Sequence, residues 1–265
     1  MANKGLEFEW CIYHLIAKAN PLKYKSDADA KKAAAIYKTA GKDVQASAQN
    51  AVNVVTKTYG KITGVAKKSG GGTEPKTDLI ITASKKLKCS LKYGGSVQLS
   101  SGGIKNTVKF LTGVITNLSK EEGVSKKQAK ELLALLSNMQ NELGDLGSLP
   151  KPKAEKILKQ SEEYNDALQN ILGSRKNPDV VEKYQNIKVA IIEEAMTGKY
   201  TFSGSPDLSA DHILSESYIR KIDKKFIEEV AGRTSVRLAL KGRGSKEMSG
   251  KEVRLNEIVV RFDTK

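Results

Sequence analysis

Cysteine and histidine are scarce in this sequence, and their scarcity excludes several kinds of site. The 265 residues include only two cysteines and two histidines. Cys11 and Cys89 lack metal-ligand spacing, so they form neither a disulfide framework nor a zinc site. Both lie in apolar segments, where we expect them to be buried. His14 and His212 cannot supply a multi-histidine metal site, and two scattered histidines give no basis for a Ser-His-Asp triad.

Long apolar runs and nucleotide-binding loops are also missing. No apolar run approaches the ~20 residues that span a bilayer, and the start, MANKGLEFEW, lacks the uninterrupted apolar core of a signal peptide. We therefore expect a cytoplasmic protein without a membrane partner. The G-x-x-x-x-G-K-[ST] loop of P-loop ATPases does not occur. Aromatic residues make up 6%, and no strand interleaves basic and aromatic residues as RNA-binding strands do.

Positive charge is what the sequence has in excess. Lys and Arg number 45 against 30 Asp and Glu, which gives a formal net charge of +15. Such an excess favours a polyanionic partner, because each phosphate that is neutralised releases condensed counterions. The lysines are spread along the chain, which argues against a disordered basic tail. Nucleic acid is the favoured partner; judged by charge alone, acidic membranes and acidic proteins are the alternatives.

Helical periodicity with clear start and stop signals covers much of the chain. Over residues 5–19, Phe8, Ile12 and Ile16 belong to one continuous apolar arc, and Asn20-Pro21 ends the helix. The same reasoning predicts helices over residues 26–41, 43–60, 104–118, 125–143, 152–172 and 177–198.

Strand-like composition occurs in two places. Residues 78–83 and 86–93 are rich in apolar and β-branched types and are predicted to pair as a hairpin with a lysine-rich turn. The Gly- and Ser-rich segment 94–103 is predicted as a bent strand or a loop. The tail, residues 235–263, indicates two strands around a glycine-rich connection. Helices, then strands, then helices, then strands indicate an α+β or mixed α/β fold rather than regular βαβ units.

The predicted hairpin carries a motif. In EPKTDLIITASKKLKCSLKYGG, Asp78 enters the first strand, and Ser-Leu-Lys ends the second at Lys92. PKTD followed by SLK resembles the PD-(D/E)xK motif of the restriction-endonuclease-like nuclease superfamily. The resemblance implies a hairpin that brings two acids and a lysine to one metal. It also implies a central mixed sheet with the N-terminal helix packed against it. The similarity covers roughly residues 5–103.

Ser90 departs from this motif, because the resemblance implies an acid two residues before the lysine. A serine cannot supply a charged metal ligand at neutral pH. Either the site is inactive or the second carboxylate comes from elsewhere. GLEFEW resembles the G-x-x-F-E helix start of such nucleases and offers Glu7 and Glu9. Glu9 lies at the edge of the apolar arc and Glu7 on the opposite side, which favours Glu9.

The resemblance implies a Mg²⁺ site, with Mn²⁺ as the alternative metal. Asp78, Glu9 and the backbone carbonyl of Leu91 would be its protein ligands. These are oxygen donors, which Mg²⁺ prefers.

Three further residues receive roles from the resemblance. Lys92 would orient or help to deprotonate a metal-bound water, or neutralise the phosphate. Ser90 would hydrogen-bond a metal-bound water. Gln98 would contact the substrate or order the attacking water.

Four cations are candidates for binding the nucleic-acid backbone. Lys76 precedes Asp78 in the motif, and Lys241, Arg243 and Lys246 flank glycines in the tail. A glycine-rich loop follows a phosphate backbone with N–H groups and cations together. A solvated hairpin turn is the alternative.

The resemblance suggests three parts and two functions. Residues 1–118 would form a nuclease-like core, residues 119–198 a helical insertion or subdomain, and residues 199–265 a C-terminal β-hairpin region that completes the core. The first hypothesis is a metal-dependent DNA nuclease, which a homodimer would suit because each site cuts one strand. The second is a catalytically degenerate relative that binds DNA or DNA ends. If phage-encoded, the protein would act in the host cytoplasm or in the virion, among virion components.

Overall fold

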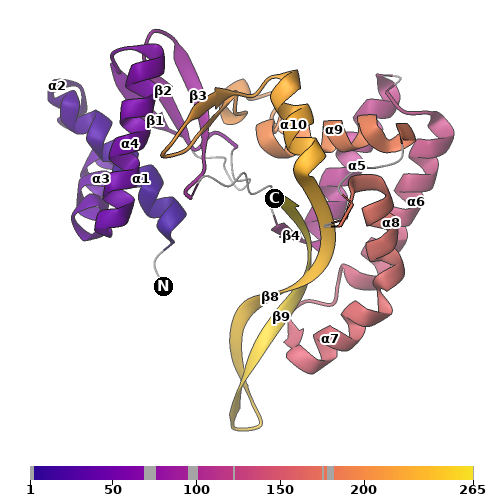
Figure 1. Ribbon diagram of the computed structural model, residues 1–265. Coiled ribbons are helices and arrows are strands. Elements are labelled where there is room, and N and C mark those ends of the chain that lie inside the picture. Colours follow the sequence, from indigo (N-terminus) through magenta and orange to yellow (C-terminus); the bar gives the residue numbers. More distant parts are fainter. Residues whose placement is uncertain are drawn as a thin grey trace. The chain divides into compact units, whose positions relative to one another are not determined.

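The structure is a computed structural model, and it describes residues 3–68, 76–94, 101–121, 123–174, 176–177 and 182–264. The chain forms two compact units (Figure 1). The first comprises Met1–Val97 with Met196–Phe226, and the second comprises Gln98–Ala195 with Ile227–Lys265. The division into three parts that the sequence suggested stays a prediction.

The first unit begins with helices that have clear local causes. They are α1 (Lys4–Ala19), α2 (Pro21–Tyr24), α3 (Ala28–Thr39) and α4 (Lys42–Tyr59). The side chain of Asn3 accepts a backbone N–H of the first turn of α1, and Asp27 does the same for α3. Such caps satisfy N–H groups that have no partner within the helix. Asn20 ends α1, and the proline that follows it opens α2.

A mixed sheet forms the centre of the first unit. Its order is β1 (Gly64–Lys67), β2 (Leu79–Thr82), β3 (Lys86–Leu91), β6 (His212–Leu214) and β7 (Ile219–Lys221). β1, β2 and β3 form an antiparallel meander, β6 runs parallel to β3, and β7 is antiparallel to β6. Parallel neighbours need a long crossover connection. Here the chain between β3 and β6 contains the greater part of the second unit.

One face of this sheet is buried against the N-terminal helices. Its apolar cluster joins Phe8, Cys11, Ile12 and Ile16 of α1, Ala33 of α3, and Val44, Ala48 and Val55 of α4 to Leu79, Ile81, Leu87, Cys89, Leu91 and Leu214 of the sheet. Side chains alternate along a strand, so Ile80, Lys88 and Ser90 point to the opposite face. The candidate motif therefore divides between the two faces at the end of β3.

Helices make up most of the second unit. They are α5 (Ile104–Lys120), α6 (Lys126–Leu143), α7 (Lys151–Gln160), α8 (Glu162–Leu172), α9 (Glu182–Thr197) and α10 (Lys224–Arg233), the last two of which cross its boundaries. α7 and α8 are divided at Ser161, where the sequence predicts one helix. The Ser161 hydroxyl donates to the carbonyl of Ile157 at 2.8 Å, a contact that bends or interrupts helices.

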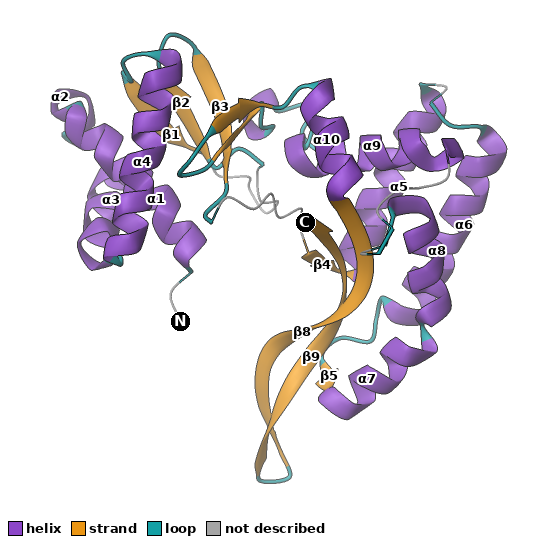
Figure 2. Ribbon diagram, in the orientation of Figure 1, coloured by secondary structure: helices purple, strands orange, loops and turns teal. Residues whose placement is uncertain are grey.

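A long hairpin forms most of the second sheet. β8 (Thr234–Met248) pairs with β9 (Lys251–Thr264) in antiparallel register, and the short strands β4 (Ser101–Gly103) and β5 (Leu149–Pro150) pair with β9. The prediction of a glycine-rich connection is wrong for most of that segment, because β8 continues through it to Met248. Only Ser249 and Gly250, both with positive φ, form the turn (Figure 2).

The mixed α+β class that the sequence predicts is confirmed, while the restriction-endonuclease-like core stays a prediction. The predicted hairpin corresponds to β2 and β3. The short strands β1, β6 and β7 and the helix α10 were not expected. In the part of the chain that the structure describes, no helix has the length and apolar character to cross a membrane.

Candidate functional site

The β2–β3 hairpin brings the two halves of the motif into contact. The backbone N–H of Asp78 donates to the carbonyl of Cys89 at 2.9 Å, one residue before β2 begins. Oδ2 of the Asp78 carboxylate accepts the backbone N–H of Leu91 at 2.6 Å and the Ser90 hydroxyl at 3.4 Å. Ser90 is only 4% exposed. The aspartate therefore extends the β2–β3 hydrogen bonding with its side chain and lies beside the serine of the motif.

Lys92 follows at the same end of the sheet. Its backbone N–H donates to the carbonyl of Leu214 on β6 at 2.9 Å, which continues the β3–β6 pairing one residue beyond β3. Leu91 belongs to the buried cluster, so strand alternation directs Lys92 to the face of Ser90. The lysine is half-buried.

Glu9 approaches the same end of the sheet from the helical face. Its carboxylate forms an ion pair with Lys67, the last residue of β1. Lys67 lies opposite Leu79, the residue directly after Asp78. The side chains of Glu9 and Lys67 are 18% and 23% exposed, and Lys67 Nζ lies 5.2 Å from the centre of the Trp10 ring. Lys67 therefore neutralises the charge of Glu9 next to the candidate site.

The chemistry of the candidate ligands indicates which metal ions they could bind. Among the described residues, no three His, Cys, Asp or Glu side chains gather into a group that would hold a metal. Mg²⁺ does not require such a cage, because one or two carboxylates bind it together with water and phosphate oxygens. Asp78, the Leu91 carbonyl and Glu9 are oxygen donors of that kind, and Glu9 is paired with Lys67 in this structure. A structural zinc site, with its four nitrogen or sulfur ligands, does not fit.

Two polar atoms close to these strand ends are buried without a hydrogen-bond partner among the described residues. They are Oγ1 of Thr77 and Oε2 of Glu216. Thr77 directly precedes Asp78, and Glu216 comes two residues after β6. Such atoms are rare in native proteins, and each calls for a water, an ion or a ligand. Thr77 therefore has a buried hydroxyl, directly before the aspartate of the motif, that no described residue hydrogen-bonds.

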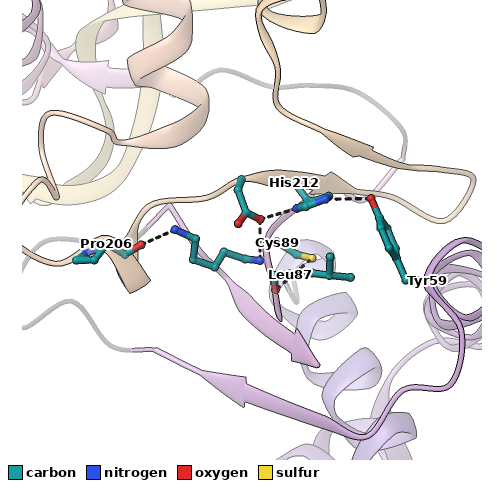
Figure 3. A network of polar contacts seen from close by, with 7 residues as sticks. Tyr59, Leu87, Cys89, Pro206 and His212 are labelled. Atoms are coloured by element: carbon teal, nitrogen blue, oxygen red, sulfur yellow. Dashed lines mark hydrogen bonds and ion pairs between the residues drawn. The ribbon is translucent and has the colours of Figure 1, made fainter. Parts of the chain in front are cut away.

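A second polar network joins β3, β6 and the end of α4, and sequence reasoning missed it. Nε2 of His212 lies 3.0 Å from the Tyr59 hydroxyl, and Nδ1 lies 2.5 Å from Oδ1 of Asp211. Asp211 also accepts the backbone N–H of Lys88 at 2.8 Å, and Lys88 Nζ donates to the carbonyl of Pro206 at 2.7 Å (Figure 3). Because His212 is buried with both ring nitrogens engaged, it ties sheet to helix rather than serving as a base.

Burial and these contacts shift several pKa values. Burial raises the pKa of the Asp211 carboxyl, but the hydrogen bonds from the imidazole and from a backbone N–H outweigh it, so the net pKa is lowered. Burial also raises the pKa of Tyr59. It raises the pKa of Cys11 to about 11 and raises that of Cys89 further. Both cysteines are buried, as the sequence predicts, and their thiols stay protonated, which excludes a thiolate nucleophile.

The remaining candidates for this end of the sheet have different outcomes. The backbone N–H of Lys76 donates to the carbonyl of Leu208 at 3.0 Å, so this lysine is part of the first unit beside the hairpin. Gln98 lies outside the described residues. Lys67, which binds Glu9, was not singled out from the sequence, because the two residues are 58 positions apart.

The three tail cations belong to the second unit. Lys241, Arg243 and Lys246 are exposed residues of β8, not of a loop. Arg243 lies in a bulge where the β8–β9 register shifts, and it forms an ion pair with Glu257 of β9. Lys241 lies directly opposite the same glutamate. Of the three, Lys246 is nearest to the turn of the hairpin.

Comparison with known proteins does not assign a function to the chain. No family model, curated protein or solved structure matches the chain.

Proposed function

We propose that this protein is a metal-dependent DNA nuclease whose site is built on the β2–β3 hairpin. The observation that carries the proposal is the contact of Asp78 with Ser90 and Leu91 at the end of the sheet. A mixed sheet with the N-terminal helix packed on one face supports it, because the resemblance to PD-(D/E)xK nucleases implies that arrangement.

The chain's own residues divide the work as follows. Asp78, Glu9 and the Leu91 carbonyl would hold Mg²⁺ or Mn²⁺. Before the metal binds, Lys67 compensates the charge of Glu9. When bound, the metal would supply a water of lowered pKa and would stabilise charge on the phosphate. Lys92 neutralises the phosphate or orients the attacking water, and the Ser90 hydroxyl holds the Asp78 carboxylate in position.

Net charge supports DNA as the substrate. The chain carries +15, and phosphate neutralisation by Lys and Arg supplies most of the affinity of non-specific DNA binding. Lys76 lies next to the β2–β3 hairpin, and we propose that it binds a phosphate of the DNA backbone.

A second candidate is a nuclease-like protein that binds DNA or DNA ends without cutting them, such as a phage structural component. The observation that favours it is the chemistry around Asp78. Ser90 stands where the resemblance implies an acid, and its hydroxyl is directed at Asp78. Glu9, the replacement carboxylate, is neutralised by Lys67. If neither changes when DNA binds, the site holds too little negative charge for a divalent metal.

Supercoiled plasmid separates the two candidates. The purified protein is incubated with plasmid in Mg²⁺, in Mn²⁺ and in EDTA, beside Asp78→Asn. The matched control is Asp207→Asn, because Asp207 is an exposed acid of the same unit that pairs with Lys68 and Lys86. We expect nicking that needs the metal, is abolished by Asp78→Asn and survives Asp207→Asn.

The other outcomes are equally informative. Nicking that persists in Asp78→Asn would overturn the hairpin site. Plasmid, linear DNA and single-stranded DNA that all stay intact, together with a gel shift that weakens with salt, would favour the second candidate. Sedimentation of the protein on DNA tests the homodimer that double-strand cutting implies.

A further inference from the structure

The end of the β8–β9 hairpin extends past the elements that cover its base. β5 pairs with β9 at Leu255 and Asn256, and from there to the turn the described residues pair only within the hairpin. We call residues 244–255 the arm. All residues from Lys241 to Glu252 are exposed, and Figure 2 shows the loop end of the hairpin lying clear of α7. A two-stranded ribbon is only marginally stable alone in water, so a partner surface would stabilise the arm.

Lysines and acids lie on different faces of the arm. Directly opposed residues share a face, and faces alternate along the strands. One face carries the pairs Gly244–Leu255, Lys246–Val253 and Met248–Lys251, and the other carries Ser245–Arg254 and Glu247–Glu252. Both lysines therefore lie on the first face, and both acids lie on the second together with Arg254. Within the described part of the chain, neither lysine forms an ion pair, whereas Glu252 accepts a hydrogen bond from Ser245.

The arm has the dimensions of a ribbon that enters the major groove. From the pair Gly244–Leu255 to the pair Met248–Lys251 it spans four steps, or about 14 Å at ~3.4 Å per residue. The major groove of B-DNA is about 8.5 Å deep and about 12 Å wide and admits a two-stranded ribbon, whereas the minor groove is only about 6 Å wide. The arm is thus long enough for its turn to reach the edges of the nucleobases while Gly244 and Leu255 stay outside the groove.

The charges decide which partner the lysine face suits. A second copy of this chain would bring the Lys246 and Lys251 face of one arm against a molecule that also carries +15. DNA phosphates offer the complementary charge on both sides of the groove. The exposed side chain of Met248, 46% accessible near the turn, suits apolar contact with base edges such as the thymine methyl group.

We propose that the arm binds the major groove of double-stranded DNA through its lysine face, with Lys246 and Lys251 on the phosphates. The inference rests on the proposed function in taking DNA as the partner, and it adds the duplex as the form bound. It does not depend on cleavage, because the arm belongs to the second unit and Asp78 to the first.

Fluorescence anisotropy with a duplex oligonucleotide and with its single strand tests whether the arm binds duplex DNA. The buffer contains EDTA, in which a metal-dependent nuclease does not cleave the DNA. The variant is Lys246→Ala/Lys251→Ala. The control is Lys126→Ala/Lys130→Ala, which removes two exposed lysines from α6 of the same unit. Losing two phosphate contacts reduces the slope of log K against log salt by about 1.8, which is about 30-fold in duplex affinity at ~0.15 M salt. We expect that loss in the arm variant alone and a smaller loss on the single strand.

Several results would overturn the proposal. They are unchanged duplex affinity in the arm variant, an equal loss in the control variant, and an equal loss on single-stranded DNA. Altered self-association with unchanged DNA affinity would assign the arm to a second copy instead. Asp78→Asn keeps the two proposals apart, because it should stop cleavage and leave duplex affinity intact. If the plasmid is never cut but the arm variant still loses duplex affinity, only the nuclease proposal fails.

Discussion

Replacing Glu9 and Lys67 singly and together measures how strongly their ion pair stabilises the first unit. The pair is partly buried, with 18% of the glutamate side chain and 23% of the lysine side chain exposed. Exposed pairs contribute about 0.2–1 kcal/mol, whereas removing one partner of a buried pair costs about 3–5 kcal/mol. We therefore expect Glu9→Gln to lower the free energy of unfolding by about 1–2 kcal/mol, with a similar coupling energy between the two residues.

A double-mutant cycle gives the coupling energy directly. Wild type, Glu9→Gln, Lys67→Met and the double variant are unfolded in urea, and the free energy of unfolding is extrapolated to water. Lys67→Met also loses the contact with the Trp10 ring, about 0.5–1 kcal/mol, but the same loss occurs in the double variant and cancels. A coupling energy below about 0.5 kcal/mol, which is the spread for independent sites, would refute the inferred role of Lys67.

The same variants show whether Lys67 competes with the metal for Glu9. Calorimetric titration with Mg²⁺ needs no substrate and no turnover. If Glu9 is a ligand, Glu9→Gln weakens Mg²⁺ binding and Lys67→Met strengthens it, because the carboxylate no longer has to leave a cation first. Equal Mg²⁺ affinity in all three proteins would remove Glu9 from the ligand set and leave it a purely structural role.

The other predictions concern two aspartates. Asp78→Ala leaves the buried N–H of Leu91 without its acceptor and should cost about 1–3 kcal/mol in urea unfolding, whereas the Asp78→Asn amide oxygen still accepts it and should cost less. Equal losses would contradict the hydrogen-bonding role. Asp211 has a lowered folded-state pKa, so its stabilisation is complete above the unfolded pKa of about 4 and is lost as pH falls through the folded value. Thermal melts of wild type and Asp211→Asn should therefore differ most at neutral pH and converge in acid; a gap that widens in acid would refute this.

Local signals in the sequence were sufficient for several long helices and for the β2–β3 hairpin. α1, α4 and α6 follow apolar periodicity between a cap and a glycine or proline, and β2 and β3 are short β-rich runs around a tight turn. Such features depend on residues close together in the chain. The resemblance to PD-(D/E)xK nucleases implied that Asp78 and the Ser-Leu-Lys segment lie together, and the structure places Asp78 in contact with Ser90 and Leu91.

Features that depend on distant residues were missed. β6 and β7 have three residues each, too few for a periodic pattern. β6 pairs with β3, although most of the second unit lies between the two strands in the sequence. Lys67 belongs to a four-residue strand, β1, and its partner Glu9 lies on α1. In the tail, glycine and serine suggested a loop, but the long β8–β9 pairing overrode local preference.

Ser90 is better understood as part of a charge arrangement than as a missing ligand. An acid at position 90 would lie next to the Asp78 carboxylate, and two carboxylates that close repel each other unless a cation or a proton intervenes. The serine hydroxyl instead donates to the Asp78 carboxylate, which also accepts the backbone N–H of Leu91. In the proposed nuclease the second negative charge comes from Glu9, which forms an ion pair with Lys67 in this structure. Both candidate functions share this metal-free state, and they differ only in whether Lys67 releases Glu9 when metal and DNA arrive.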